Sequence, residues 1–577
     1  MGKKIWVCDD DASERYPVWT RGNVGETFAQ VVSPLNWSIF GVRAWEPGWR
    51  DGFCEMGAFA PGDFKPAGQC EICACFGGYV YINMSVTRVL ALRIPGMTIE
   101  AIDRSLFGER EGAPPHRPDP RDRNPERTAR VSAWLASLFT VDPAPAVHAD
   151  RARLDALLAG RPDFRGLADQ QLLDYMRSLA GEGRALFRRH VVCSYGANVL
   201  ASMIAQICQA VGAGGFASKV TAAIGDVESA AQSFELWELS RQVNASPAVA
   251  GEFDKGVEGL LDRLRTGSGP RTKDFLEQWD GFIGRWGSMG PNVWELRSPT
   301  YRTDPEMALR MLDRARRAPD AASPAARAAT LVAEREAAIA EIAGRLAGDA
   351  RAREQFMGAA RSVGRYLAAR ERCKTHCTLL IDEARSAARE LGQRLVARGC
   401  LARWEDVLLV TDGEADAFLA NPASHGGLIG ERAARLEMLE DKEPPFVFEG
   451  DPPPLSAFTD RGGGKFEPAG AGTRLTGIGV SPGRYTGRAR VIKTLGAESE
   501  LEPGEIIVAV TTDASWGPLF LAAGAVVVET GATISHAAIV SRELGIPAAA
   551  SVMDATRRIR EGDLITVDGN SGIVTIQ

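Results

Sequence analysis

The stretch VVVETGATISHAAIVSRELGIPAAAS (residues 526–551) predicts a strand, a sharp turn and a helix start in succession. The β-branched run at its beginning is typical of a buried strand, and Gly531 permits a sharp turn after it. Ser535 is a favourable N-cap residue, because its hydroxyl can accept a hydrogen bond from a free N–H group of the first helical turn. His536 is therefore expected at the first position of the helix.

The predicted helix ends at Gly545, a typical left-handed terminator, with Pro547 just beyond it. His536 would then lie beside free backbone N–H groups at the positive end of the helix dipole. This position disfavours the imidazolium form and stabilises a dianionic phosphoryl group on the ring. A histidine that accepts and passes on a phosphoryl group needs both properties. The residues alone also allow a packed core histidine that hydrogen-bonds a backbone group.

Residues 473–577, which surround this helix, have the pattern of an α/β domain. Short β-branched runs separated by turn residues predict its strands. The expected strands are RARVIK (488–493), EIIVAVT (505–511), AVVVET (525–530) and LITV (564–567). A Pro- and Gly-rich stretch without helical periodicity, residues 443–472, precedes the domain and predicts a semi-flexible linker.

The remaining residues, 1–442, divide into a mixed region and a helical one. Short β-rich runs such as GGYVYINMSV (77–86) predict an α/β part at the N-terminus. Ala, Leu, Arg and Glu at 3.6-residue spacing predict helices from about residue 128 to about residue 440. One helix is expected to start at Ser323-Pro324, and a later one to end at Gly399.

The amino-acid composition excludes several classes of function for this protein. The chain has 577 residues, enough for two to four domains, and its 67 basic and 74 acidic residues give a net charge of −7. This balance argues against a general nucleic-acid or anionic-membrane binder. Ten cysteines are too few for a disulfide scaffold, and none of their spacings matches a zinc finger, so we expect reduced thiols and no metal site.

Targeting signals are not evident in the sequence. Acidic residues follow Lys3 and Lys4 where a signal peptide would have its apolar region, and the longest apolar run, residues 519–528, is too short to span a bilayer. We therefore expect a cytoplasmic protein.

TGATISHAAIVSRELGIPAAASV (530–552) resembles the phosphohistidine signature of the PEP-utilising enzymes, which include pyruvate phosphate dikinase, phosphoenolpyruvate synthase and rifampin phosphotransferase. The flanking stretches GIGVSPGRYTGRARVI (477–492) and GDLITVDGNSGIVTI (562–576) are similar to the entry and the closing hairpin of the same domain. One departure is Ala532, where many members have glycine. The resemblance implies that residues 473–577 form a swivelling domain and that His536 is the phosphoryl carrier.

Two upstream stretches resemble the substrate domain of rifampin phosphotransferase and related proteins. They are YPVWTRGNVGETFAQVVSPLNWSIF (16–40) and the stretch with a helical pattern at residues 365–414. The resemblance implies a largely helical substrate domain over residues 1–442. It also implies that the ATP-grasp domain of the family is absent from this chain and acts as a partner subunit that binds ATP and Mg²⁺.

Four further residues are candidates for binding phosphate or substrate. Arg370 and Lys374 are spaced i,i+4 and are expected on one helix face, where two cations can hold phosphoryl oxygens. Glu371 lies between them, and its role is ambiguous. Arg21, between Trp19 and a glycine-containing turn, suits anion binding. The alternative for the helical pair is two solvated charges.

The stretch RWGSMGPNVWELRSPTYRTDP (285–305) is similar to a family segment that usually carries a His-Arg pair before Gly-Pro. Here Ser288 and Met289 stand in those places, which indicates an altered acceptor pocket. The nearby aromatic residues Trp286, Trp294 and Tyr301 suit either an apolar pocket or core packing.

The sequence thus predicts a heteromeric, dikinase-type phosphotransferase. A partner ATP-grasp subunit would phosphorylate His536, and the group would pass to the hydroxyl of a small aromatic acceptor with release of AMP and phosphate. Split systems of the phenylphosphate synthase type make a phenol or alkylphenol the leading acceptor, as in aromatic degradation. The alternatives are a rifamycin-type antibiotic phosphotransferase component and a non-catalytic phosphocarrier.

Overall fold

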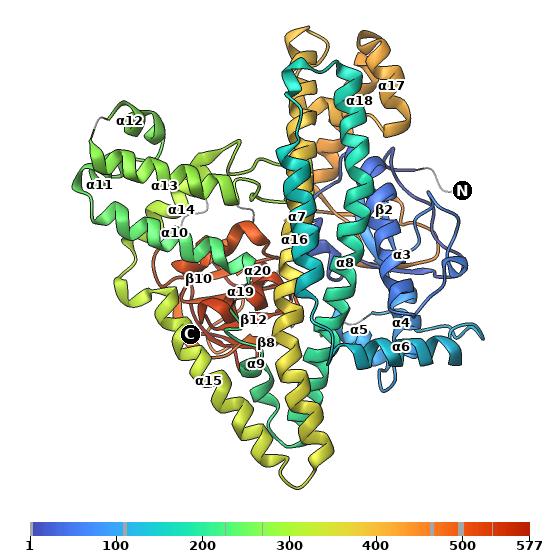
Figure 1. Ribbon diagram of the computed structural model, residues 1–577, viewed down its shortest axis with the longest axis vertical. Helices are drawn as coiled ribbons and strands as arrows, with labels where there is room; N and C mark the ends of the chain where they lie inside the picture. Colours follow the sequence, from blue (N-terminus) through green and yellow to red (C-terminus); the bar gives the residue numbers. More distant parts are fainter. Residues whose placement is uncertain are drawn as a thin grey trace. The chain divides into compact units, whose positions relative to one another are not determined.

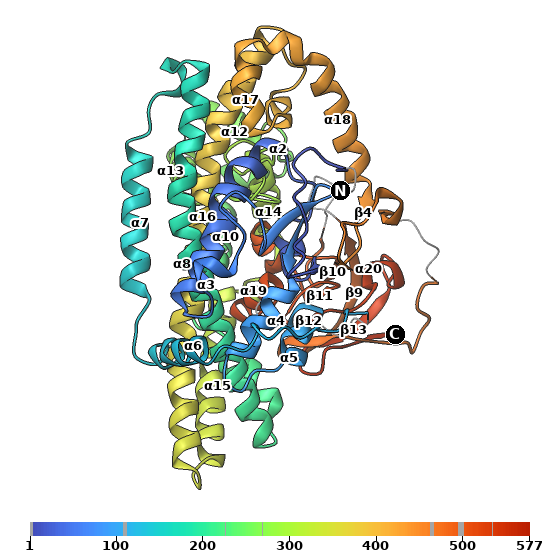
Figure 2. The same ribbon diagram turned by 90° about the vertical axis from the view of Figure 1, so that its right-hand side faces the viewer.

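The computed structural model divides into two compact units, each assembled from separate stretches of the chain (Figures 1 and 2). Unit 1 comprises residues 1–196, 294–297 and 372–465, and unit 2 comprises residues 197–293, 298–371 and 466–577. The structure describes residues 4–107, 112–225, 227–267, 269–461, 467–493, 501–532 and 535–577.

Unit 1 contains a small antiparallel sheet that joins both ends of the unit. Its strand order is β2-β3-β1-β5, and Trp19 in β1 lies opposite Asn83 in β3 and Phe448 in β5. The predicted N-terminal α/β part is therefore present. The strands are β1 (Val18–Thr20), β2 (Cys73–Phe76), β3 (Tyr79–Asn83) and β5 (Val447–Glu449).

Part of the stretch that we predicted to be linker is ordered secondary structure. β5 belongs to this stretch and pairs with β1, and β6 (Thr459–Asp460) pairs with β4 (Lys442–Glu443). Residues 462–466 lie outside the described residues. The Pro and Gly content gave no sign of these short strands, because a strand of two or three residues leaves almost no periodic signal.

Helices form most of the rest of unit 1, and those between residues 128 and 440 were predicted. Two long helices, α8 (Asp169–Ala210) and α16 (Ala350–Ala397), contribute residues to both units, and Gly399, with φ 71°, follows the end of α16 as expected. The other α-helices of four or more residues are α1 (Val24–Thr27), α3 (Glu46–Glu55), α4 (Met84–Arg93), α5 (Ile99–Phe107), α6 (Pro125–Ser137), α7 (Ala144–Ala159), α17 (Asp412–Ala420) and α18 (Gly426–Glu440).

Helix α8 is more apolar than the sequence analysis anticipated. An 18-residue window of this helix has a mean hydropathy of 1.5, so its length and composition would allow it to cross a membrane, and 44% of the window is buried within the protein. Core helices of soluble proteins have the same properties, so this feature does not identify a membrane span.

Unit 2 combines a helical module with a C-terminal module. In the helical module, residues 217–293 and 298–345, α15 begins at Pro324 with Ser323 as its N-cap, as predicted. Its helices are α9 (Ala217–Val220), α10 (Glu228–Asn244), α11 (Pro247–Phe253), α12 (Leu260–Thr266), α13 (Pro270–Trp286), α14 (Pro305–Arg317) and α15 (Pro324–Arg345).

The C-terminal module, residues 467–577, is built on an eight-stranded mixed sheet. Its strand order is β7-β14-β13-β9-β10-β11-β12-β8, with β9, β10, β11 and β12 parallel and the flanking pairs antiparallel. All four predicted strands are present. The strands are β7 (Arg474–Thr476), β8 (Ile478–Ser481), β9 (Arg484–Ile492), β10 (Ile506–Ala509), β11 (Ala525–Val528), β12 (Ala548–Ala550), β13 (Leu564–Asp568) and β14 (Ile573–Ile576).

The central strands are buried on both faces, as expected for parallel strands. In β11, Ala525 and Val527 belong to a core formed within the C-terminal module, whereas Val526 and Val528 belong to a larger core that also includes the helical module. This alternation follows from the two-residue period of a strand. One face of the sheet is therefore directed toward the helical module, on the side where α19 (His536–Leu544) lies.

Candidate functional site

His536 is the first residue of α19, as the sequence predicted. Ser535 is the N-cap residue, and its hydroxyl accepts a hydrogen bond from Ala538 N at 3.4 Å. Gly545 ends the helix with φ 67°. Two residues of the preceding turn, Thr533 and Ile534, lie outside the described residues.

The His536 side chain is buried, with 6% of its surface exposed. Its Nδ1 lies 3.2 Å from Thr512 Oγ1, and its ring centroid is 6.1 Å from that of Phe520. Thr512 follows β10, and Phe520 belongs to the 3₁₀ helix η9 (Ala514–Leu521). Neither Thr512 nor Phe520 was among the predicted site residues. Their place in the sequence was the available signal, because both lie in the segment that connects two adjacent predicted strands.

The segment beside Thr512 connects the C-terminal module to the helical module. Asp513 caps η9 by accepting a hydrogen bond from Ser515 N at 2.9 Å, and its other carboxylate oxygen accepts one from Asn292 N at 3.0 Å. The Tyr301 hydroxyl donates to Ser515 O at 3.2 Å. The loop that precedes α14 therefore lies next to the segment that holds His536.

The other end of α19 is attached to the same module. The Glu543 carboxylate accepts hydrogen bonds from Ile224 N at 2.9 Å and Gly225 N at 3.1 Å, and burial raises the pKa of Glu543. Arg542 donates through Nε to Val480 O at 2.5 Å, and burial lowers its pKa to about 10. Both ends of α19 are thus held by hydrogen bonds within unit 2.

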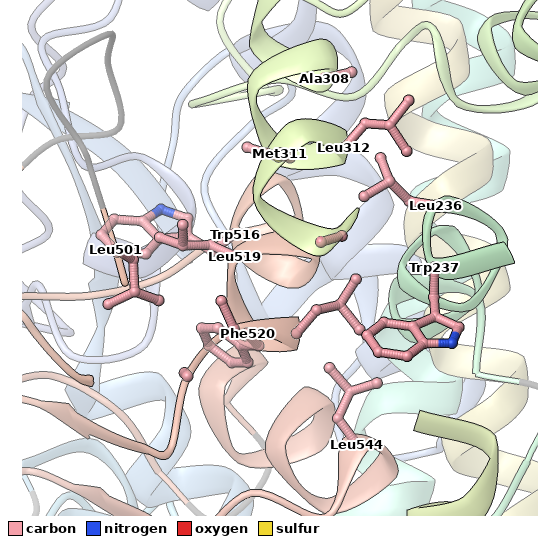
Figure 3. Packing of buried hydrophobic residues seen from close by; sticks show 14 of the residues in the cluster. Leu236, Trp237, Ala308, Met311, Leu312, Leu501, Trp516, Leu519, Phe520 and Leu544 are labelled. Atoms are coloured by element: carbon pink, nitrogen blue, oxygen red, sulfur yellow. The ribbon is translucent and has the colours of Figure 1, made fainter. Parts of the chain in front are cut away.

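An apolar core surrounds these polar contacts. Leu236 and Trp237 of α10 pack with Phe520 and Leu519 of η9, and Leu544 of α19 lies beside them (Figure 3). Figure 1 shows α10 and α14 beside this part of the sheet, where they contact η9. In this structure the C-terminal module is therefore docked on the helical module, with His536 buried.

Two family models match parts of this chain, and together they include most of the helical module and of the C-terminal module. "Rifampicin phosphotransferase fourth domain" matches residues 190–371, and "PEP-utilising enzyme, mobile domain" matches residues 501–572, which include His536 and Thr512. Residues 190–371 and 501–572 thus carry domains of the PEP-utilising, rifampicin phosphotransferase-like family. This confirms the resemblance inferred from residues 530–552.

Curated relatives cover larger parts of the chain. A rifampicin phosphotransferase of Streptomyces sp. is 31% identical over 62% of this chain and 41% of its own length. The prodigiosin synthesizing transferase PigC of Serratia marcescens is 30% identical over 63% of this chain and 40% of its own length. An uncharacterised protein of Mycobacterium tuberculosis is 32% identical over 50% of this chain and 30% of its own length. The chain thus spans less than half the length of each.

The predicted phosphate-binding residues Arg370, Glu371 and Lys374 lie in α16, as expected. Arg370 forms an ion pair with the adjacent Glu371, which is buried. The boundary between the two units falls between Glu371 and Arg372, so Lys374 is grouped with unit 1. The helix is confirmed, and the role of these three side chains in the family's chemistry stays a prediction.

Arg21 occupies a buried position in unit 1. Its guanidinium donates to Val80 O at 2.8 Å and to Phe28 O at 2.9 Å, and it lies over the rings of Tyr79 and Tyr81. Burial lowers the pKa of Arg21. These contacts are those of a residue that ties loops to a sheet, and a role in substrate binding stays a prediction.

The residues of the predicted acceptor pocket are core residues of two different units. Trp286, Met289 and Tyr301 belong to the core of unit 2. Trp294 is in unit 1, where its ring centroid lies 5.2 Å from that of Trp45. Core packing, the alternative that the sequence left open, is what the structure shows for these side chains.

Metal binding was not expected in this chain. Among the residues that the structure describes, no group of three or more His, Cys, Asp or Glu side chains is placed to hold a metal ion.

Proposed function

We propose that this protein is a phosphotransferase in which His536 carries a phosphoryl group from ATP to the hydroxyl of a small aromatic acceptor. The observation that carries the proposal is the position of His536 at the N-terminus of α19, with Nδ1 held by Thr512, inside the region that matches the mobile domain of the family. The N–H groups of a helix N-terminus stabilise a bound phosphoryl dianion.

The geometry around the imidazole supports a loading step at one ring nitrogen. Since Thr512 engages Nδ1, Nε2 is the ring nitrogen that we assign as the nucleophile. In the proposed dikinase reaction a partner ATP-grasp subunit presents ATP with Mg²⁺. Nε2 attacks the β-phosphorus, the bond to the α-phosphate oxygen breaks, and AMP leaves. Water then releases the γ-phosphoryl group as phosphate, and the β-phosphoryl group stays on His536.

In the transfer step, phosphorus exchanges its bond to the histidine nitrogen for a bond to the acceptor oxygen. The N–P bond breaks while the acceptor oxygen forms an O–P bond, and the hydroxyl proton passes to a base. Cations near the moving group stabilise its charge, and Arg370 and Lys374 are our candidates for this role, with Glu371 positioned by its ion pair to Arg370. A phenol or alkylphenol is the acceptor that we propose first.

A rifamycin-type acceptor is the second candidate. The matched fourth-domain model and the rifampicin phosphotransferase relatives favour it. A phosphocarrier without an acceptor of its own is a third role, and the large share of the chain outside residues 467–577 argues against it.

Chemical phosphorylation tests the transfer step without the partner. Potassium phosphoramidate would load His536, and mass spectrometry would map the acid-labile phosphate before and after addition of phenol, 4-methylphenol or rifamycin SV. We expect phosphate to leave His536 and appear on a phenol. His536→Ala should give no product, whereas His425→Ala, which alters a half-buried histidine of unit 1, should behave as wild type. Transfer to rifamycin alone would favour the second candidate, and no transfer to any acceptor would contradict the transferase role.

Isotopic labelling tests the loading step with the partner present. We expect [β-³²P]ATP, but not [γ-³²P]ATP, to label His536, with AMP and phosphate as products. Label from the γ-position with release of ADP would overturn the dikinase assignment.

A further inference from the structure

Helix α10 carries a polar turn on its buried face. Ser229, Gln232 and Ser233 are spaced i, i+3 and i+4, and their exposed fractions are 5%, 0% and 0%. This turn faces Gly517 of η9, where an added Cβ would lie 3.1 Å from Ser233 Oγ and 3.2 Å from Gln232 Nε2. The two modules of unit 2 therefore meet at close range through polar groups on one side and a glycine on the other.

The hydroxyls of this turn lack a hydrogen-bond partner. Ser229 Oγ and Ser233 Oγ are buried without one among the described residues, and so are Ser288 Oγ and Thr300 Oγ1 in the segment that precedes α14. Burial of a hydroxyl without a partner is unfavourable, because its hydrogen bonds to water are lost and not replaced. Ser233 Oγ lies against Gly517 of η9, so its burial opposes the docked arrangement, and Ser229 is one helical turn away on the same face.

Other contacts between the same modules favour docking. Asp513 and Glu543 accept hydrogen bonds from backbone N–H groups of the helical module, and the Tyr301 hydroxyl donates to Ser515 O. Leu236, with the other apolar residues of the shared core, adds hydrophobic burial. The interface thus combines favourable hydrogen bonds and apolar contacts with the unfavourable burial of hydroxyl groups. Such a mixture is expected for surfaces that separate.

We propose that Ser229 and Ser233 are positioning residues that weaken docking, so that the C-terminal module can leave the helical module and expose His536 for loading. When the module leaves, both hydroxyls regain hydrogen bonds to water. Glu543 acts in the opposite sense and holds α19 in place. This inference rests on the proposed phosphoryl-carrier role of His536, and it assigns the release step to the polar turn of α10.

The test compares variants that shift docking in opposite directions. Ser229→Ala/Ser233→Ala removes both hydroxyls and keeps the helix, so docking should tighten and loading of His536 by potassium phosphoramidate should slow about tenfold, which is about 1.4 kcal/mol. Glu543→Gln keeps the shape but loses a carboxylate oxygen, and loading should accelerate. Ser240→Ala is the matched control, because Ser240 is buried on the same helix with its hydroxyl donating to Trp237 O. It should load as wild type.

Hydrogen exchange gives a readout that does not depend on phosphoryl transfer. We expect the backbone amides of α10 and η9 to exchange more slowly in the double serine variant and faster in Glu543→Gln. Unchanged exchange and unchanged loading in the double variant would overturn the proposal. If exchange shifts as expected but His536 is loaded in no variant, the docking inference stands and the proposed carrier function fails.

Discussion

The Nδ1 atom of His536 lies 3.2 Å from the hydroxyl oxygen of Thr512, although 24 residues separate them in the chain. Thr512 follows β10 and His536 follows β11, and these two strands are parallel neighbours. Because the carboxyl ends of parallel strands meet at the same sheet edge, residues after each strand can share one site. The contact fixes the ring orientation through Nδ1, and Nε2 is the atom that we propose as the nucleophile.

Removal of this contact should slow phosphorylation of His536. In Thr512→Val the hydroxyl is lost, and because one neutral hydrogen bond contributes about 1 kcal/mol, loading by phosphoramidate should fall several-fold. Thr512→Ser should retain most of the rate. Thr511→Ala is a neighbouring control, since Thr511 Oγ1 has no hydrogen-bond partner among the described residues. Equal rates in all three variants would show that Thr512 does not orient the imidazole.

Loss of the N-cap should destabilise α19. Ser535→Ala removes the acceptor for Ala538 N, and such substitutions lower the free energy of unfolding by about 1 kcal/mol. Ser535→Asp should keep the cap but slow loading, because its charge repels the incoming phosphoryl group. Urea unfolding with hydrogen exchange over α19 would measure the first effect. A Ser535→Ala protein as stable as wild type would contradict this account of the helix start.

Substitution of Arg21 distinguishes a role in packing from a role in substrate binding. Arg21→Met leaves Val80 O and Phe28 O without their donors, so we expect a loss of about 3 kcal/mol in unfolding free energy. The measurement is the urea midpoint together with the transfer rate of protein that remains folded. A variant with wild-type stability but no transfer would instead establish the substrate role.

The acid stability of unit 1 should depend on Glu414. Two hydrogen bonds of 2.7 Å from Arg432, together with those from Thr411, lower the pKa of Glu414 to about 2. Because the pKa is lower in the folded protein, the stabilisation is present above about pH 4.5 and is lost as the pH falls toward 2. Its size is about 1 kcal/mol, since the Glu414 side chain is 35% exposed and solvent screens the pair. Glu414→Gln should narrow the difference between urea midpoints at pH 6 and pH 3, and an unchanged difference would refute the assignment.

The sequence predicted local features of the site correctly. Ser535 as N-cap, His536 at the helix start and Gly545 at its end are all present. Capping and turn preferences act within three or four residues, so a short stretch contains the whole signal. The strand runs of the C-terminal module were recognisable for a related reason, because strands buried on both faces are rich in β-branched residues.

Contacts between distant segments were not predictable in this way. Glu543 was not singled out, because its partners are backbone N–H groups of residues 224 and 225, and such groups have no sequence signature. Arg21 was selected from its neighbours in the sequence, whereas Val80 and Phe28 determine its burial. The pairing of β5 with β1 joins segments more than 400 residues apart.

The sequence by itself thus determined that His536 begins a helix after a buried strand, in a stretch typical of a phosphoryl-carrying histidine. Only the tertiary structure decided which side chain contacts the imidazole and which helices pack against α19. The reason is physical: a helix start depends on hydrogen bonds to adjacent residues, whereas the Thr512 contact and the polar turn of α10 depend on strand order and on how two modules pack.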